Sequence, residues 1–139
     1  MPLLQARAVN IIHPDLATSG GILETKRIGD LAQEHGISMA LHMAGTPVST
    51  MASVHCAAAT ENFIGLEHHF SEVPFWSDFI DGVPKPVIQI GYIEVPEGPG
   101  LGFELNSEVV KEHLLPEDPG FFEPTPQWDT ERSWDRLWS

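Results

Sequence analysis

Three short apolar runs alternate with two helical segments in the first half of the chain, and this alternation restricts the fold more than any other feature. The apolar runs are 8–12, 37–41 and 63–66, and the helical segments between them are 22–35 and 48–60. This order is typical of parallel strands joined by right-handed helical crossovers. Because the runs are almost continuously apolar, we expect strands that are buried on both faces.

A polar side chain follows each predicted strand. Asp15, His42 and Glu67 stand just past the three apolar runs, 27 and 25 residues apart, and each interval is one helix–strand unit. Because parallel strands end on the same side of a sheet, we expect these side chains along one edge of it. That edge is where open α/β sheets and barrels bind their ligands.

The three residue types fit proton transfer. An aspartate beside His42 would fix the imidazole tautomer, raise its pKa toward neutrality and stabilise its protonated form. Glu67, in a crowded acidic site, is expected to stay protonated and to donate a hydrogen bond to developing oxyanion charge. The alternative is that each polar residue only solvates the end of its strand. Three such residues on consecutive units favour a catalytic set of Asp15, His42 and Glu67.

Further histidines surround these positions and are secondary candidates. His13 and His69 are candidates for substrate binding, since each is next to or near a catalytic candidate in the sequence. Glu67 and His69 also form a possible metal pair, but a solvent-exposed role is favoured, and no metal site is predicted. Because successive strand residues point to opposite faces, only one of His68 and His69 can lie close to Glu67.

The second half has a different composition. The first seventy residues hold three of the twelve prolines, and all four tryptophans follow them, so we divide the chain into 1–70 and 71–139. Residues 86–95 and 101–105 are predicted to form a β-hairpin across the turn at 96–100. Ser107 is predicted to cap a short helix that runs to Leu115. An irregular tail follows, with large aromatic residues that we expect to dock on an apolar surface: Phe121, Phe122, Trp128, Trp134 and Trp138.

Charge and cysteine content exclude several classes of protein. Twenty acidic residues against seven basic ones give a net charge of −13, which excludes nucleic-acid binding and disfavours anionic membrane surfaces. The single cysteine, Cys56, excludes a disulfide framework and a multi-cysteine zinc site. Without a long apolar stretch or a secretory signal at 1–10, we expect a cytoplasmic protein with no membrane partner.

Three segments resemble a known family. They are PDLATSGGILETKRIGDLAQEHGISMALHMAG at 14–45, ENFIGLEHH at 61–69 and PVIQIGYIEVPEGPGLGFELN at 86–106. Together they resemble the C-terminal part of the mandelate racemase and muconate-lactonizing group of the enolase superfamily, and most closely its sugar-acid dehydratases, such as galactonate dehydratase. The resemblance implies an α/β fold that is the last section of a TIM-type barrel, followed by a β-hairpin that belongs to a capping domain.

The resemblance also implies roles for the strand-end residues. His42 matches the catalytic histidine, Asp15 the aspartate that orients it, and Glu67 the glutamate that hydrogen-bonds an enediolate. In such enzymes Mg²⁺ binds the carboxylate of the substrate while the α-proton is abstracted. The implied partner is a small sugar acid, and the complete enzyme is expected to be a homo-oligomer.

The chain departs from the family pattern in what it lacks. A complete (β/α)₈ barrel needs about 250 residues, and the strands that carry the family's three carboxylate ligands have no counterpart among these 139 residues. Mg²⁺ is therefore expected to bind poorly to this chain alone, and the isolated chain is expected to be inactive. The alternatives are a racemase, epimerase or cycloisomerase of the same superfamily, and a truncated remnant without catalytic function.

Overall fold

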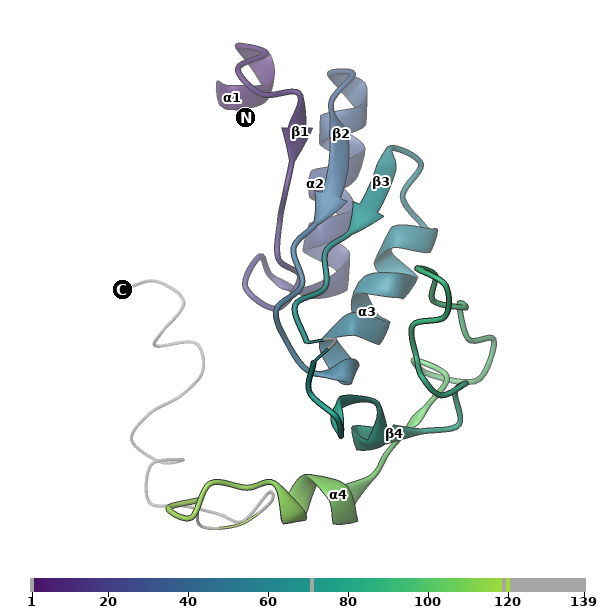
Figure 1. Ribbon diagram of the computed structural model, residues 1–139. Helices are drawn as coiled ribbons and strands as arrows, with labels where there is room; N and C mark the ends of the chain where they lie inside the picture. Colours follow the sequence, from purple (N-terminus) through teal and green to yellow (C-terminus); the bar gives the residue numbers. More distant parts are fainter. Residues whose placement is uncertain (1, 71, 119, 121–139) are drawn as a thin grey trace. The chain divides into compact units, whose positions relative to one another are not determined.

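The computed structural model describes residues 2–70, 72–118 and 120, and the chain falls into two compact units. The first unit, Met1–Leu105, contains the parallel sheet and the helices that pack on it (Figure 1). The second unit, Asn106–Ser139, begins with one short helix. The division of the chain into 1–70 and 71–139 stays a prediction.

The predicted parallel sheet is confirmed. Strands β1 (Ile11–Ile12), β2 (Ser38–Leu41) and β3 (Phe63–Leu66) lie side by side in the order β1-β2-β3 (Figure 1). Both pairings are parallel, and β2 pairs with β3 across a register irregularity between Met39 and Ala40. The three strands therefore end on the same side of the sheet, as their apolar runs predicted.

Two helices connect these strands and pack on the sheet. Helix α2 (Gly21–Glu34) packs against β2, helix α3 (Pro47–Ala58) packs against β3, and the two helices pack against each other. Gly36, at φ 70, closes α2 in the left-handed conformation that glycine adopts without strain. Pro47 opens α3 at a position where its missing N–H has no helical partner to lose.

The two faces of the sheet are buried to different extents. The expectation that the strands are buried on both faces is therefore wrong. Met39 and Leu41 in β2 are fully buried and pack with Ala57 of α3, but Ser38 and Ala40, which alternate with them along the strand, are half-buried. In β3, Ile64 is 56% exposed. The helices cover one face, and among the described residues the opposite face is covered only in part.

The predicted hairpin at 86–95 and 101–105 is wrong. The antiparallel pair consists instead of β4 (Ile80–Asp81) and β5 (Glu104–Leu105), with Ile80 opposite Leu105. Within 86–95 the chain reverses on itself: Gln89 and Tyr92 exchange backbone hydrogen bonds of 2.8 and 2.9 Å around Ile90 and Gly91. Both central residues have positive φ, 50° and 79°. Such a two-residue turn needs positive φ at both positions, and Gly91 makes it accessible.

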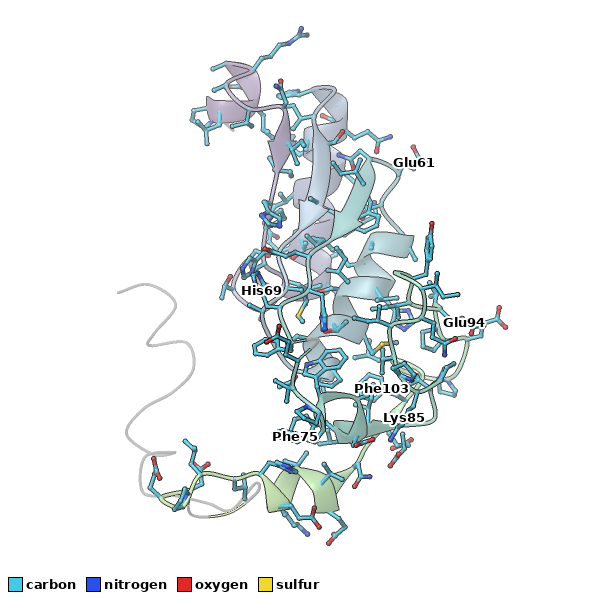
Figure 2. The ribbon with its side chains drawn as sticks, in the orientation of Figure 1. Glu61, His69, Phe75, Lys85, Glu94 and Phe103 are labelled. Atoms are coloured by element: carbon cyan, nitrogen blue, oxygen red, sulfur yellow. The ribbon has the colours of Figure 1, made fainter. Side chains whose placement is uncertain are left out.

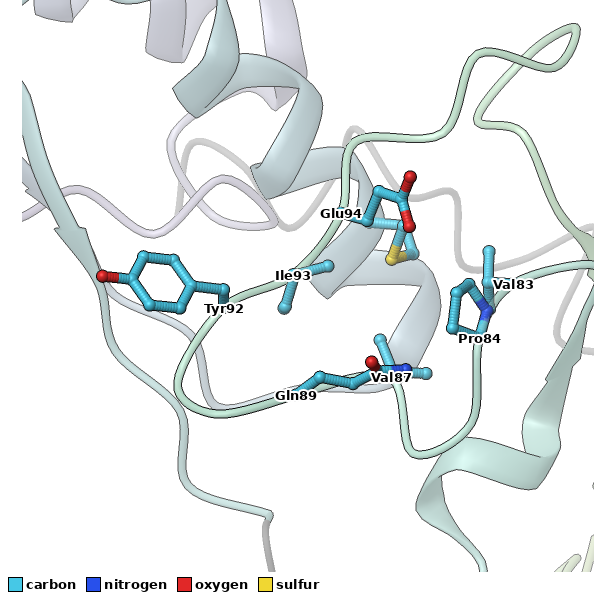
Figure 3. A pocket seen from close by; sticks show the side chains of 8 residues that line it. Val83, Pro84, Val87, Gln89, Tyr92, Ile93 and Glu94 are labelled. Atoms are coloured by element: carbon cyan, nitrogen blue, oxygen red, sulfur yellow. The ribbon is translucent and has the colours of Figure 1, made fainter.

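Residues 72–105 are held by an apolar cluster on α3 and the loop before it. Trp76 of the 3₁₀ helix η1 (Trp76–Phe79), Ile80 and Val87 are buried together with Met43 and Met51. The Trp76 indole also donates a hydrogen bond of 3.0 Å to the Gly45 carbonyl. Residues 83–94 fold over Met51 and leave a small open pocket there (Figure 3).

One short helix was not predicted from the sequence, and another begins at a different cap residue than predicted. Helix α1 (Pro2–Gln5), which the sequence did not predict, buries Leu4 against Ala32 and Ile37. Helix α4 (Ser107–Glu112) is one residue shifted at its cap, because Asn106, and not Ser107, accepts the hydrogen bond from the Val109 amide.

The described part of the chain extends only a few residues beyond α4. The helix ends at Glu112 and not at Leu115. The tail aromatics Phe121, Phe122, Trp128, Trp134 and Trp138 lie outside the described residues. No helix in the described part of the chain combines the length and the apolar character needed to cross a bilayer.

Candidate functional site

The ends of the three strands bring Asp15, His42 and Glu67 together. Beyond β1 and β2 the parallel pairing continues in a single bridge between Asp15 and His42. His42 Nδ1 lies 2.7 Å from Asp15 Oδ2, and His42 Nε2 lies 3.7 Å from Glu67 Oε2. The three residues predicted from their places after the strands thus form one contiguous cluster on the edge of the sheet.

Asp15 is fixed on both of its carboxylate oxygens. Oδ2 accepts from His42, and Oδ1 accepts from the amides of Ala17 and Thr18 at 2.8 and 3.2 Å. Burial acts to raise the pKa of Asp15, but the His42 and backbone hydrogen bonds outweigh it, so the pKa is lowered. An ionised Asp15 only accepts hydrogen bonds. His42 therefore carries its proton on Nδ1 and presents the lone pair of Nε2 outward.

Glu67 is surrounded by three imidazoles. Its Oε1 accepts from His69 Nε2 at 2.7 Å, and its Oε2 lies 3.3 Å from His13 Nε2. The His69 hydrogen bond lowers the pKa of Glu67, with further lowering by the nearby His69, His42 and His13 charges, and burial opposes it. The expectation of a protonated Glu67 is therefore wrong, because its neighbours are histidines and not further acids.

One oxygen of Glu67 is poorly satisfied. The side chain as a whole is 33% exposed, but Oε2 itself is shielded from solvent. It has no hydrogen-bond partner among the described residues. A shielded carboxylate oxygen without a hydrogen bond is unfavourable unless a positive group compensates it. Its nearest nitrogens are His13 Nε2 at 3.3 Å and His42 Nε2 at 3.7 Å, and these imidazoles compensate its charge only when they are protonated.

The two secondary candidates also lie at this site. The His13 and His69 rings lie beside the His42 ring, the first edge-on and the second tilted, with centroid distances of 5.6 and 6.0 Å. Both are about half exposed, and His69 lies past the tips of the strand arrows (Figure 2). For His69, the sequence signalled closeness to Glu67 by its place two residues after that glutamate. For His13, the only signal was its place near Asp15 at the end of the first predicted strand. Their role in binding a substrate stays a prediction.

His68 points away from this cluster, as the alternation of strand side chains predicted. Its ring packs edge-on against Trp76 at a centroid distance of 4.7 Å, and burial is the main cause that lowers its pKa. His68 thus packs on one member of the apolar cluster that holds residues 72–105. Of the two adjacent histidines, only His69 contacts Glu67.

The side chains of the cluster are partly exposed to solvent. The side chains of Asp15, Glu67 and His42 are 25%, 33% and 38% exposed. The pocket under residues 83–94 and a larger groove along α3, β3 and 88–95 are lined by other residues. Chemically, the cluster offers a histidine base with a fixed tautomer. It also offers three groups, on His42, Glu67 and His69, whose ligand atoms all lie within 4.8 Å of one another.

Curated relatives match most of this chain. It is 42% identical over 113 residues to the D-xylonate dehydratase of Haloferax volcanii, which covers 81% of this chain and 27% of that protein. It is 32% identical over 120 residues to the D-galactarolactone cycloisomerase of Agrobacterium fabrum, with 82% of this chain and 32% of that protein covered. The chain thus spans about a third or less of the length of these relatives.

Solved structures agree with these relatives in fold. A mandelate racemase/muconate lactonizing enzyme-like protein from Rubrobacter xylanophilus superposes with a TM-score of 0.80 at 43% identity, over 87% of this chain and 30% of that one. The enolase C-terminal domain-like family matches residues 1–109. That domain is the TIM-barrel part of such enzymes, which agrees with the parallel sheet. The chain therefore belongs to the enolase C-terminal domain-like family, in the mandelate racemase and muconate-lactonizing group of the enolase superfamily.

Proposed function

We propose that this chain provides the general-base section of the active site of a sugar-acid dehydratase. The observation that carries the proposal is the 2.7 Å contact between His42 Nδ1 and Asp15 Oδ2, which leaves Nε2 open at the edge of the sheet. The similarity to a D-xylonate dehydratase supports the substrate class, which is a sugar acid with a hydroxyl on the carbon β to its carboxylate. Which sugar acid is used does not follow from these residues.

In this proposal His42 moves the proton. Nε2 takes the proton from the carbon α to the substrate carboxylate, and the electron pair of that C–H bond forms the enediolate. The β-hydroxyl then leaves as water with a proton returned from His42. Asp15 stabilises the imidazolium between the two steps. Glu67, ionised and 3.7 Å from Nε2, adds to that stabilisation.

Members of the superfamily generally use Mg²⁺, but the residues of this cluster do not fit that ion. Mg²⁺ selects oxygen ligands, and carboxylates in particular. The grouped ligand atoms here belong to two imidazoles and one carboxylate. We therefore assign no step to Mg²⁺ held by these residues. For the same reason, we expect the isolated chain to be inactive.

A second candidate is proton transfer without loss of water, as in a cycloisomerase. The similarity to a D-galactarolactone cycloisomerase favours it. The same base serves both reactions, since each begins with removal of a proton next to a carboxyl carbon. The products separate the two: a dehydratase yields a 2-keto-3-deoxy acid, and an isomerase yields a product of unchanged mass. A chain without any catalytic role would yield neither.

A segment exchange tests the proposed base. The matching segment of the Haloferax volcanii D-xylonate dehydratase is replaced by this chain, and 2-keto-3-deoxy acid formation is measured. The exchanged protein is expected to dehydrate a sugar acid. His42→Asn keeps an N–H donor toward Asp15 but removes the base, and it is expected to lower kcat by about 10²–10⁴-fold. His55→Gln, on the far helix α3, is the matched control.

One outcome would contradict the proposed base, and another would contradict the expected inactivity of the isolated chain. One is a folded exchange protein whose activity is unchanged by His42→Asn, since the base would then lie elsewhere. The other concerns the isolated chain, assayed by mass spectrometry on a panel of aldonic and aldaric acids with Mg²⁺. Turnover that His42→Asn abolishes would show that the chain is active alone and that the expected inactivity is wrong.

A further inference from the structure

The side chains that surround Glu67 also form a set of metal ligands. We propose that His42 Nε2, the Glu67 carboxylate and His69 Nε2 bind a divalent transition-metal ion of the zinc class. The three ligand atoms lie within 4.8 Å of one another, and they come from two neighbouring strand ends of one sheet. This site is distinct in chemistry from a carboxylate site for Mg²⁺, and it goes beyond the proposed dehydratase function.

The spacing of the ligand atoms requires only small side-chain movements. Zinc is bound at about 2.0–2.2 Å from nitrogen and oxygen, which places tetrahedral ligand atoms about 3.3 Å apart. His69 Nε2 now lies 2.7 Å from Glu67 Oε1, and His42 Nε2 lies 3.7 Å from Glu67 Oε2. An ion between them replaces the His69–Glu67 hydrogen bond. His69 is 53% exposed, so its ring can adjust without disturbing the core.

The donor types select the ion. Imidazole suits zinc, copper and nickel, and its affinity for these ions exceeds that for magnesium, which prefers hard oxygen ligands. Three protein ligands from His and Glu are also the number that open zinc sites use, with the fourth position left for water. The same three ligands that fail to fit Mg²⁺ are therefore suitable for a zinc-class ion.

Two contacts around the ligands support the site. Asp15 accepts the Nδ1 proton of His42, and this outer carboxylate fixes the tautomer in which Nε2 can ligate a metal. Glu67 Oε2 is shielded from solvent and has no hydrogen-bond partner among the described residues, and His13 Nε2 at 3.3 Å compensates its charge only when protonated, so a cation beside it would compensate a shielded anionic oxygen. The orientation of His42 and the unsatisfied oxygen of Glu67 are independent observations.

Such an ion has a consequence for the proposed reaction. His42 Nε2 cannot hold a metal and accept a proton with the same lone pair. A zinc-class ion at this site would therefore block the general base. Binding itself does not depend on the reaction, so it can be measured on the chain without a substrate, and its failure would leave the proposed function untouched.

The test is calorimetric titration of the full 139-residue chain with Zn²⁺ alone and, separately, with Mg²⁺. We expect saturable binding of one Zn²⁺ per chain, at least 100-fold tighter than any Mg²⁺ binding. His69→Gln and Glu67→Gln are each expected to weaken Zn²⁺ binding at least tenfold. Asp15→Asn, which loses only the outer contact, is expected to weaken it by about 10–100-fold. His113→Gln, in the second unit, is the control and should leave the affinity within twofold.

Circular dichroism of each variant checks that it is folded, and nitrogen NMR of the unsubstituted chain gives a second measurement. Zn²⁺ should shift the Nε2 resonances of His42 and His69 and leave Nδ1 of His42 protonated. The proposal is overturned if Zn²⁺ does not bind, or if a folded His69→Gln chain binds it as tightly as the unsubstituted one. It is equally overturned if the imidazole resonances that shift belong to other histidines.

Discussion

Residues 8–69 and residues 72–105 share one compact unit but are organised by different interactions. In 8–69 each strand is hydrogen-bonded to the next strand in the chain, and one helix connects the two. The contacts therefore repeat from one helix–strand unit to the next. In 72–105 regular structure is limited to a 3₁₀ turn and a two-residue strand pair. That segment is held by Trp76, Ile80 and Val87, which pack on Met43 and Met51.

This difference explains where prediction from the sequence succeeded. A repeated helix–strand unit leaves a periodic pattern that can be recognised without knowing the tertiary structure. A segment fixed by a few buried anchors leaves no such pattern. In 86–95 an alternating apolar pattern predicted a strand, but Val87 is an anchor on the core whereas Ile90 and Tyr92 are 97% and 80% exposed. The four changes below test how independent the two regions are.

The largest effect is expected for Trp76→Ala. This change removes a large buried side chain and its hydrogen bond to Gly45, and it should lower the free energy of unfolding by about 3–5 kcal/mol. Amide exchange should rise mainly within 72–105. Tyr92→Ala removes an exposed aromatic side chain of the same region and should cost about 0.5 kcal/mol or less. Equal loss of protection in β1–β3 would show that the two regions unfold together.

Met39→Ala is the corresponding change in the sheet. Met39 of β2 is fully buried on the face of the sheet that the helices cover. Its truncation should lower the free energy of unfolding by about 2–5 kcal/mol, measured by urea titration. Ile64→Ala, at a site 56% exposed on the neighbouring strand, is the control and should cost clearly less. Similar losses for both variants would contradict the finding that one face of the sheet carries most of the packing.

Asp15→Asn tests the strand-end cluster through pH. Burial raises the pKa of Asp15, but its hydrogen bonds lower it overall from the ordinary value of 3.8. Its stabilisation is therefore complete above that value and is lost as pH falls through the lower folded-state pKa. The unsubstituted chain should lose more stability between pH 5 and pH 2 than Asp15→Asn does. At pH 7 the variant should be about 1.5–3 kcal/mol less stable, the usual range for a hydrogen bond to a charged group.

Glu97→Gln, at an exposed carboxyl in the loop before β5, is the control for this pH series. Its unfolding curve should follow that of the unsubstituted chain from pH 7 to pH 2. A parallel pH dependence for Asp15→Asn and the unsubstituted chain would mean that the Asp15–His42 contact does not stabilise the fold. The series is measured by urea titration at each pH.

The smallest effect is expected for Ile90→Asn. Ile90 is 97% exposed and has a φ of 50°, which is unfavourable for a β-branched residue. An Asn-Gly pair is the preferred sequence for this turn, so the change should raise the free energy of unfolding by about 1 kcal/mol. Gly91→Ala, at φ 79, should act in the opposite direction. Both are read from thermal unfolding, and a loss of stability for Ile90→Asn would contradict the turn.

The candidate site was predicted in position but not in detail. The places of Asp15, His42 and Glu67 after three strands were enough to bring them together, because the strands are parallel and adjacent. Their spacing did not show that His13 and His69 would both reach Glu67. That arrangement reverses the expected protonation of Glu67, since imidazoles stabilise its anion. A pKa depends on every neighbour within a few ångströms, and the sequence alone does not place those neighbours.

The sequence by itself determined the order of strands and helices, the parallel sheet and the common edge of Asp15, His42 and Glu67. Each of these follows from patterns within one or two helix–strand units, which local hydrogen bonds and periodic burial enforce. Only the tertiary structure decided which face of the sheet is covered, how 72–105 packs on Met51, and which oxygen of Glu67 is left unsatisfied. These features depend on contacts between residues distant in the chain, and no short sequence pattern encodes them.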